Sequence, residues 1–424
     1  MIQYINNYII GPILPVFLGL SGIILLFYFR FKPITKIKKL IQSTDNNAKK
    51  SESIKSLFLG LSGTLGVGNI AGVAAAIAVG GSGSVFWMWF FGLLAMVIKY
   101  SEVVLSAKYN SEESGGAANY IDKGLRSKCL AGVYSILIII TSISVGNVVQ
   151  SSAASESLNV CFQIPKIQTG VIIAIVTLLL VYGGRERVSR FSSAVIPILC
   201  LAYVIISIAI IISNISLIPE ITLDIISNAF NAESCGGGFL GIMTSKAFRF
   251  GASRGVLSNE AGCGTICYAH SNSSGSPAKQ GVWGMMEVFI DTILLCTLTA
   301  FVVLIYKDSL QGKDNGMMVA ISAYGHIGDI GSKFIGISSA IFALASIVCW
   351  SYYGLCALDY LKAKKNTRIL YLFVYSITGI VGSIFAPKLV WEISDLVISA
   401  LAIYNLTFVL LLSKEVKKSI DSDL

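Results

Sequence analysis

Glycine and small polar residues are concentrated in one segment near the start of the 424-residue chain. Eight glycines occur between residues 60 and 83, and Thr64 and Asn69 flank Gly66. Each glycine inside a helix costs about 1 kcal/mol relative to alanine, so a helix through this segment would unwind most readily near Gly66. A helix break leaves free N–H groups that suit an anion and free carbonyls that suit a cation. Close helix packing through small residues such as Gly68 is the alternative interpretation.

A second segment, residues 238–270, has a similar composition. Ser258, Asn259 and Glu260 form a polar cluster that is followed at once by Gly262. An ionisable side chain is costly in hydrocarbon, so Glu260 is expected to face the protein interior, to pair, or to be protonated. The segment therefore predicts a second helix break with an internal acid. A helix-end carboxylate that holds two helices together is the alternative.

Both segments lie in a chain with the composition of a membrane protein. It is 54% hydrophobic and only 13% charged, with a mean hydropathy of +0.75, whereas soluble proteins carry about 25% charged residues. Transmembrane β-barrels alternate apolar and polar residues, but the runs 136–140 and 205–212 are solidly apolar. The composition excludes soluble, disordered and disulfide-rich classes, and it predicts an all-α integral membrane protein.

Hydrophobic runs of suitable length predict eleven transmembrane helices. The fifth is short, but we expect it to cross the membrane. If it did not, the arginines that follow it would lie on the exterior side, and every later loop would lie on the opposite side of the membrane. The predicted spans are 9–29, 57–79, 85–107, 131–153, 167–182, 191–213, 239–269, 282–305, 335–358, 369–386 and 390–412.

The distribution of Lys and Arg predicts the orientation of these spans. The loop behind the first span carries eight of them, so that side is expected to be cytoplasmic. With eleven crossings, 24 of the 32 Lys and Arg residues, Lys99 included, are assigned to the cytoplasmic side. The N-terminus is then outside and the C-terminus in the cytoplasm. The net charge of +9 is explained by these loops facing anionic lipid headgroups, so no nucleic-acid partner is expected.

The two interrupted segments are the second and seventh spans, five spans apart. A repeat unit with an odd number of spans must insert in opposite orientations, which is the pattern of inverted-repeat transporters. We therefore predict one transmembrane domain over residues 1–424. It comprises an extra helix and loop (1–56), a first five-helix repeat (57–213), an exterior loop and second repeat (214–412), and a tail (413–424).

Several motifs in this frame resemble the alanine or glycine:cation symporter family. They occur in order from about Leu57 onward: SGTLGVGNIAG at the start of 62–103, GNVVQSSAASES (146–157), RGVLSNEAGCGT (254–265), VFIDTILLCTLTA (288–300) and WSYYG (350–354). The resemblance implies a leucine-transporter-like fold with a 5+5 inverted repeat and two discontinuous helices. It also implies sodium-coupled uptake of a small neutral amino acid through a bacterial plasma membrane.

The resemblance also implies roles for individual residues. A substrate carboxylate would meet the first break and the substrate amino group the second, while Gln150 would contact the substrate and Trp350 would close the pocket. Sodium would be held by Ser346 and by backbone carbonyls near Gly66. A solvated helix cap for Gln150, and an interfacial or packing tryptophan for Trp350, are the alternatives. The implied substrate-binding residues are Thr64, Gly66, Asn69, Gln150, Ser258, Asn259, Gly262 and Trp350.

Two positions depart from the family pattern. Ala345 stands where a second hydroxyl ligand is expected, which puts the strength or identity of cation coupling in question. Glu287 precedes the VFIDT motif where the family has a small residue. It would permit proton coupling or, as we favour, lie near the cytoplasmic end of its helix. Asp291 within the motif is expected to be functional or to link helices.

Other functional classes fit the sequence less well. No tandem filter sequence or charged ring indicates a channel, and the enzyme motifs H-E-x-x-H and G-x-S-x-G are absent. His270 and His326 are assigned to loops, and no organic cofactor is implied. A solute sensor without transport, or a proton-coupled transporter, remains an alternative. The sequence does not decide whether the substrate is alanine, glycine or serine, whether the D or the L form is preferred, or whether the coupling ion is sodium or a proton. It also leaves the oligomeric state open.

Overall fold

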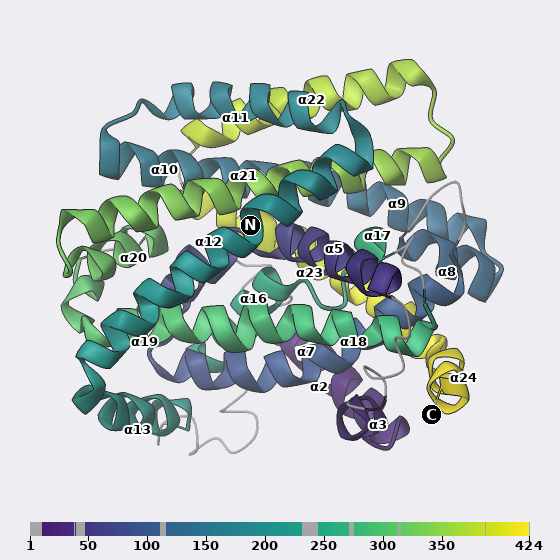
Figure 1. Cartoon of the computed structure of the whole chain (residues 1–424), viewed down its shortest axis with the longest axis horizontal. Coiled ribbons are helices and arrows are strands. Elements are labelled where there is room, and N and C mark those ends of the chain that lie inside the picture. The colour runs from purple at the N-terminus through teal and green to yellow at the C-terminus, as the bar shows by residue number, and fades with distance from the viewer. Residues whose placement is uncertain are drawn as a thin grey trace.

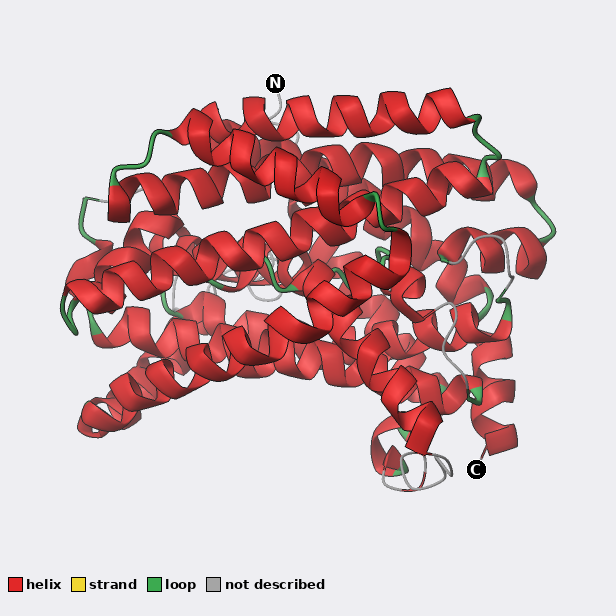
Figure 2. Ribbon diagram, turned by 45° about the horizontal axis from the view of Figure 1, so that its top comes forward, coloured by secondary structure: helices red, strands yellow, loops and turns green. Residues whose placement is uncertain are grey.

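The computed structural model describes residues 11–37, 39, 47–110, 116–230, 245–270, 275–312, 315–385 and 387–423. Every regular element within these ranges is helical (Figure 2). Seven helices are long and apolar enough to cross a membrane, and one further pair bends by 65° at a short break. The prediction of an all-α, multi-pass membrane protein is therefore confirmed.

Every predicted span coincides with helix in the described part of the chain apart from the two breaks, and residues 9–10, 239–244 and 386 of the predicted spans lie outside that part. The count of eleven crossings is not confirmed, because α2 and α11 are shorter apolar helices and the seventh span is divided. The 5+5 repeat and the orientation of the termini remain predictions. The helices of the predicted spans are α2 (Gly11–Tyr28), α5 (Asn47–Thr64) with η2 (Val67–Asn69) and α6 (Ala71–Gly80), α7 (Gly83–Lys108), α9 (Lys128–Ile143) with α10 (Gln150–Phe162), α11 (Lys166–Val181), α12 (Gly184–Ser213), α16 (Lys246–Asn259) with α17 (Ile266–His270), α18 (Pro277–Val288) with α19 (Thr297–Ile305), α21 (Asp329–Tyr360), α22 (Lys365–Ile384) and α23 (Pro387–Leu411).

Several short helices were not expected from hydropathy. They are too short or too polar for a span search to find, and they cover the ends of the bundle. They are α3 (Lys32–Thr35), α8 (Ala117–Leu125), α13 (Ile218–Ala229), α20 (Gly316–Gly325) and α24 (Ser413–Asp423), with the 3-10 turns η4 (Ile215–Leu217) and η6 (Lys307–Leu310).

Two long helices contain a wide π-helical turn. The segment η3 (Ser144–Val149) joins α9 to α10, and η5 (Phe289–Cys296) joins α18 to α19. Such turns are rare overall, and those that occur are often found at functional sites. They include or adjoin two residues singled out from the sequence, because Asp291 lies inside η5 and Gln150 directly follows η3.

The helices pack in pairs around the interrupted elements. On one side α11 lies beside α22, and on the other α7 packs against both α18 and α16 (Figure 1). The broken element α5–α6 contacts α12, α16, α17 and α21. The two breaks are therefore enclosed by other helices, so their unwound backbone is shielded from lipid.

Two sequence assignments are corrected by the fold. Lys99 was assigned to the cytoplasmic side, but its side chain is fully buried and pairs with Glu287 at 3.1 Å. Its partner Glu287, the eleventh residue of the continuous helix 277–305, is also buried, and its place near the cytoplasmic end stays a prediction. His270 was assigned to a loop, but it is buried at the end of α17.

Candidate functional site

The first break begins where α5 ends at Thr64 and continues through η2 to α6. Gly66 has an extended, non-helical backbone, and an added Cβ there would lie 2.5 Å from the Gln150 side-chain oxygen. The sequence-based expectation of unwinding around Gly66 is thus met by the structure. The site has room for Gln150 because residue 66 has no side chain.

The second break lies between α16 and α17. Glu260, Gly262 and Gly264 all have positive φ, at 54°, 90° and 75°. This conformation favours glycine and stops α16 directly after Ser258 and Asn259. A Cβ at Gly68 would lie 3.1 Å from the Cα of Ser258, so the two breaks meet in the interior.

Asp291 joins the two breaks to each other. The Asn69 side-chain amide donates to its Oδ1 at 2.7 Å, and the Ser258 and Thr292 hydroxyls donate to its Oδ2 at 2.8 and 2.7 Å. All four side chains are buried. Asp291 therefore forms a polar link between helices, and its role in transport stays a prediction. The second break gains a further link through Asn259, which donates to Thr292 Oγ1 at 3.0 Å.

Gln150 reaches the first break from the neighbouring helix. Its Oε1 accepts a hydrogen bond from the Val67 backbone N–H at 3.0 Å, and only 8% of the residue is exposed. The alternative of a solvated helix cap is wrong, because η3 and α10 form one continuous helix here. The backbone N–H groups that suit an anion are present at this break, and Gln150 holds one of them.

Trp350 and Glu260 form a contact beside the second break. The indole N–H of Trp350 donates to Glu260 Oε1 at 3.0 Å, and the Thr265 hydroxyl donates to Oε2 at 2.7 Å. Trp350 is fully buried, so it is not interfacial. An added Cβ at Gly146 would lie 2.3 Å from the Trp350 ring. Glu260 thus holds helices together from a helix end, as the alternative interpretation supposed.

Ser346 lies against the first broken helix. Its hydroxyl donates to the Gly63 carbonyl at 2.9 Å, and Ser62 donates in turn to the Ala345 carbonyl at 3.1 Å. These oxygen atoms are the type that a hard cation prefers. Ser346 is therefore adjacent to backbone carbonyls at the end of α5, close to the region expected near Gly66.

Two hollows differ in their relation to the breaks. A cavity between the first break and α12, lined by Leu65, Asn69 and Tyr203 among others, is too narrow for a water molecule. A cleft of about 740 Å³ lies between α5 and α12 and is lined by Glu52, Lys55 and Arg185 among others. The first break thus borders only a narrow cavity, whereas the outer end of α5 borders a cleft.

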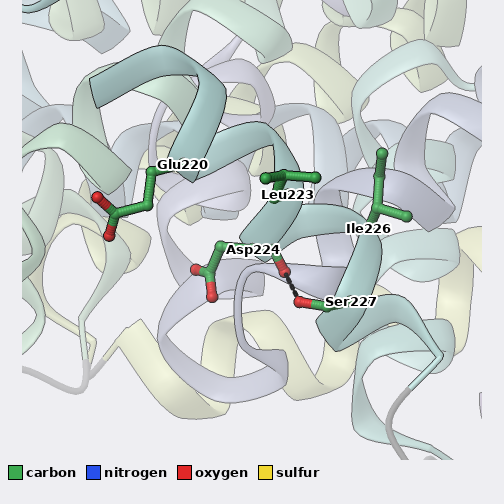
Figure 3. Close-up of a pocket in the computed structure, with 5 residues that line it drawn as sticks. All are labelled: Glu220, Leu223, Asp224, Ile226 and Ser227. Atoms are coloured by element: carbon green, nitrogen blue, oxygen red, sulfur yellow. Dashed lines mark hydrogen bonds between the residues drawn. The ribbon is translucent and has the colours of Figure 1, made fainter. Parts of the chain in front are cut away.

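A third hollow is remote from the breaks. It is a shallow surface pocket of about 410 Å³, and all its lining residues belong to α13 (Figure 3). Ser227 there donates to the Asp224 carbonyl at 3.2 Å. A pocket formed by a single surface helix brings no groups together from different elements, so it is not the functional site.

Nothing in the sequence indicated one charged contact, which joins α16 to α23. Arg254 on α16 makes two hydrogen bonds to Asp395 on α23, at 2.6 and 2.9 Å. The guanidinium also lies 4.8 Å from the ring centroid of Trp391. Arg254 had been located in the seventh span, but no sequence pattern indicated a partner that lies 141 positions away.

Comparisons with known proteins assign the chain to a family. The model of the sodium:alanine symporter family matches residues 1–422. The amino-acid carrier protein AlsT of Bacillus subtilis is 33% identical, over 93% of this chain and 85% of that protein. The sodium/alanine symporter AgcS of Methanococcus maripaludis is 30% identical, over 97% and 94%. The probable sodium/glutamine symporter GlnT of Bacillus subtilis is 29% identical, over 97% and 87%.

The fold has a solved counterpart outside this family. A manganese transporter of Eremococcus coleocola superposes with a TM-score of 0.56, over 86% of this chain and 77% of the other, at 14% identity. This likeness concerns the fold alone. The match over nearly the whole length shows that the chain belongs to the sodium:alanine symporter family.

Proposed function

We propose that this protein is a sodium-coupled symporter that carries a small neutral amino acid, alanine or glycine, across a bacterial plasma membrane by alternating access. The observation that carries this proposal is the meeting of two broken helices at Asp291, deep among apolar helices. Unwound backbone at this depth offers paired sites for an anion and a cation. Family membership and the names of the relatives support sodium as the coupling ion and an amino acid as the substrate.

The substrate would bind between the two breaks. Its carboxylate is assigned to the backbone N–H groups around Thr64, Gly66 and Asn69, where Gln150 already shows that an oxygen acceptor fits. Its amino group is assigned to the second break, at Ser258, Asn259 and Gly262. Trp350 would cover the small side chain. No arginine is assigned to neutralise the substrate carboxylate. The site therefore suits zwitterionic amino acids of low net charge.

The sodium ion is assigned to the Ser346 hydroxyl and to carbonyls at the end of α5. The Ser346 hydroxyl already donates a hydrogen bond to the Gly63 carbonyl oxygen, 2.9 Å away. Oxygen-only coordination suits sodium, and the expected second hydroxyl is missing at Ala345. We therefore expect sodium to bind through few side-chain ligands.

Access would alternate between the two ends of the broken helices. In this proposal the ion pair of Arg254 and Asp395 would hold one end closed, and the cleft beside α5 would be the opening at the other. With the predicted orientation, the closed end is exterior and the cleft is cytoplasmic. Movement of α5 and α16 about their breaks would exchange these two states.

Purified protein in liposomes tests this function. Under an inward sodium gradient we expect saturable uptake of labelled alanine or glycine, and collapse of the gradient should stop accumulation. Uptake that neither saturates nor needs a gradient would indicate a channel. Specific binding without flux would indicate a sensor. Competition by serine and glutamine would then define the substrate range.

Gln150→Ala should weaken uptake by about tenfold with normal expression. The change removes the acceptor of the Val67 N–H and leaves a buried donor without a partner, which costs about 1–3 kcal/mol. The KM for alanine measures the effect. The matched control is Gln168→Ala on the exposed side of α11, which should behave as wild type. Unchanged kinetics in Gln150→Ala would remove Gln150 from the site.

Ser346→Ala should raise the sodium concentration for half-maximal uptake, because one oxygen ligand is lost while the backbone carbonyls remain. The expected shift is about tenfold, equivalent to one hydrogen bond or ligand contact of ~1.4 kcal/mol. Sodium titration of the initial uptake rate measures it. Ser376→Ala on α22, whose hydroxyl bonds its own helix, is the control. An unaltered sodium titration would contradict the cation assignment.

A further inference from the structure

The cleft between α5 and α12 holds an excess of positive charge. It has a volume of about 740 Å³, and its walls carry three cations and two acids, namely Lys55, Arg185, Arg190, Glu52 and Glu186. Arg190 and Glu186 pair with each other at 2.8 Å, and their side chains are 77% and 84% exposed. Because this pair is neutral, the rest of the cleft carries two cations and one acid.

The two remaining cations are not neutralised by an acidic partner. Within the residues that the structure describes, neither Lys55 nor Arg185 forms an ion pair. Arg185 donates one hydrogen bond, from Nη2 to the Ala269 carbonyl at 3.1 Å. A guanidinium has five N–H donors, so this bond leaves most of them for another acceptor. The cleft thus presents two cations to a ligand that enters it.

Hydroxyl groups from both helices line the same cleft. They belong to Ser56 on α5 and to Ser189 and Ser193 on α12. The Ser193 Oγ is buried and has no hydrogen-bond partner in the described part of the chain, whereas the neighbouring Ser192 hydroxyl donates to the Val188 carbonyl of its own helix at 2.9 Å. Burying a hydroxyl without a partner is unfavourable, so Ser193 would stabilise an acceptor oxygen in the cleft.

An exposed apolar stripe on α12 continues from this cleft. Arg190 and Ala194 line the cleft, and Ile198, Leu201 and Ile205 follow them on the same face at spacings of three or four residues. The last three side chains are between 57% and 73% exposed. Since α12 is long and apolar enough to cross a membrane, such an exposed apolar surface indicates contact with lipid chains.

These features together select the class of ligand. The unpaired cations favour an anion, and the hydroxyl groups can donate to its oxygen atoms. The apolar stripe accommodates a hydrocarbon chain attached to the same molecule. A phospholipid with an anionic headgroup meets all three conditions, whereas a free phosphate ion meets only the first two. Basic pockets between transmembrane helices on the cytoplasmic side suit such headgroups, and this end of α5 is predicted to be cytoplasmic.

A headgroup in this cleft would act on both broken helices. Lys55 and Ser56 belong to α5, the half-helix before the first break. Arg185 is bonded to Ala269 of α17, the half-helix after the second break. The half-helix α5 also contacts α12 and α17 directly (Figure 1). A ligand between Lys55 and Arg185 would therefore hold α5, α12 and α17 in the arrangement of this structure.

We propose that this cleft binds the headgroup of one anionic phospholipid, and that the bound lipid stabilises the conformation in which α5 rests against α12. The phosphate would lie between Lys55 and Arg185 and accept a hydrogen bond from Ser193, with an acyl chain along the apolar stripe of α12. A ligand that prefers one conformation shifts the equilibrium toward it, so the lipid would slow the movement of α5. The effect on uptake rests on the function proposed above, whereas the binding of lipid does not.

The first test measures binding and does not require transport. Delipidated protein in neutral detergent is titrated with phosphatidylglycerol or with phosphatidylcholine, which has no net charge, and native mass spectrometry and Tm are the readouts. We expect one tightly bound phosphatidylglycerol and a rise in Tm, because a ligand of the folded state stabilises it. Lys55→Gln should weaken this binding about fivefold, the contribution of one cation near an anionic lipid. Equal binding of both lipids would overturn the proposal.

Two further variants separate the cleft from the overall surface charge. Ala194→Phe keeps every charge but places a ring where the headgroup would lie, so it should remove the tightly bound lipid. Lys123→Gln on α8 is the control, because that exposed lysine is predicted to lie on the same side and donates only to the Asn110 carbonyl. Its lipid binding should equal that of wild type. Retained binding in Ala194→Phe, or equal losses in Lys55→Gln and Lys123→Gln, would overturn the proposal.

The second test measures labelled alanine uptake in phosphatidylcholine liposomes with increasing fractions of phosphatidylglycerol. The initial rate of wild type should fall about fivefold as the cleft fills, at the lower end of ordinary coupling between two sites, while Lys55→Gln and Ala194→Phe should respond little. A rate that does not depend on phosphatidylglycerol would overturn the proposal.

Two other ligands are tested in liposomes without phosphatidylglycerol. Inorganic phosphate should leave the uptake rate unchanged, and a fall with phosphate alone would identify a free anion as the ligand and overturn the proposal. A raised KM for alanine in Lys55→Gln would assign the cations to the substrate and would also overturn it. Absence of uptake by wild type would contradict the proposed function, while the binding measurements would still decide on the lipid.

Discussion

Asp291→Asn is expected to reduce sodium-driven uptake by at least about 100-fold. The Asp291 carboxylate accepts three hydrogen bonds, from Asn69 on the first break, from Ser258 at the second, and from Thr292. Hydrogen bonds to a charged group contribute about 1.5–3 kcal/mol each. The asparagine amide has one acceptor oxygen fewer, so at least one buried donor loses its partner and the breaks are no longer held together.

The measurement is the initial rate of labelled alanine uptake per amount of protein in the liposome. Asp329→Asn on α21 is the matched control, because that carboxylate is exposed and pairs only within its own helix. Sodium and alanine binding to the Asp291→Asn variant is also measured in detergent. This measurement distinguishes a variant that no longer binds from one that binds but no longer changes conformation. Uptake within threefold of wild type would show that Asp291 does not hold the site together.

Arg254→Ala is expected to have the second largest effect, on both stability and uptake. The Arg254 guanidinium is 7% exposed and the Asp395 carboxylate 20%, so the deletion leaves a largely buried carboxylate without its bidentate partner. Breaking a buried ion pair in this way costs about 3–5 kcal/mol, and Arg254 also loses its contact with Trp391. The closed state at this end should become rare and uptake should fall by more than about tenfold.

A double-mutant cycle measures this contact. The cycle uses Arg254→Ala, Asp395→Ala and the double variant, with Tm and uptake as readouts. The double variant should be more stable than either single variant, because no buried charge is then left unpaired. Arg254→Lys keeps the charge but loses the fork geometry, so its uptake should be intermediate. Additive losses in the cycle would mean that the two residues act independently.

The sequence alone was sufficient to predict the membrane class, the positions of the long apolar helices and both breaks. These features depend on local composition, because glycine density and apolar length act within one segment. The same holds for the polar residues at the breaks, from Thr64 to Asn69 and from Ser258 to Gly262, whose roles in binding remain predictions. Their mutual approach was expected only from the family resemblance.

The rest depended on contacts between distant residues. Lys99 was misplaced because hydropathy treats a lysine as a marker of the membrane surface, and its partner Glu287 lies 188 positions away. The partner of Arg254 was missed for the same reason. Helices such as α13 and α24 were missed because they are amphipathic or polar, so hydrophobic length does not detect them. The pairing of Trp350 with Glu260 likewise has no local signal.

The two π-helical segments have a consequence for how this protein tolerates insertion and deletion. A residue advances an α-helix by about 100° around its axis, and a π turn absorbs one extra residue. Deleting any one residue of Phe289–Cys296 would restore a regular helix and rotate the flanking parts against each other. Asp291 or Thr299 would then face another direction, although every named side chain would still be present. In these two stretches, the number of residues is as much a determinant of transport as their identity.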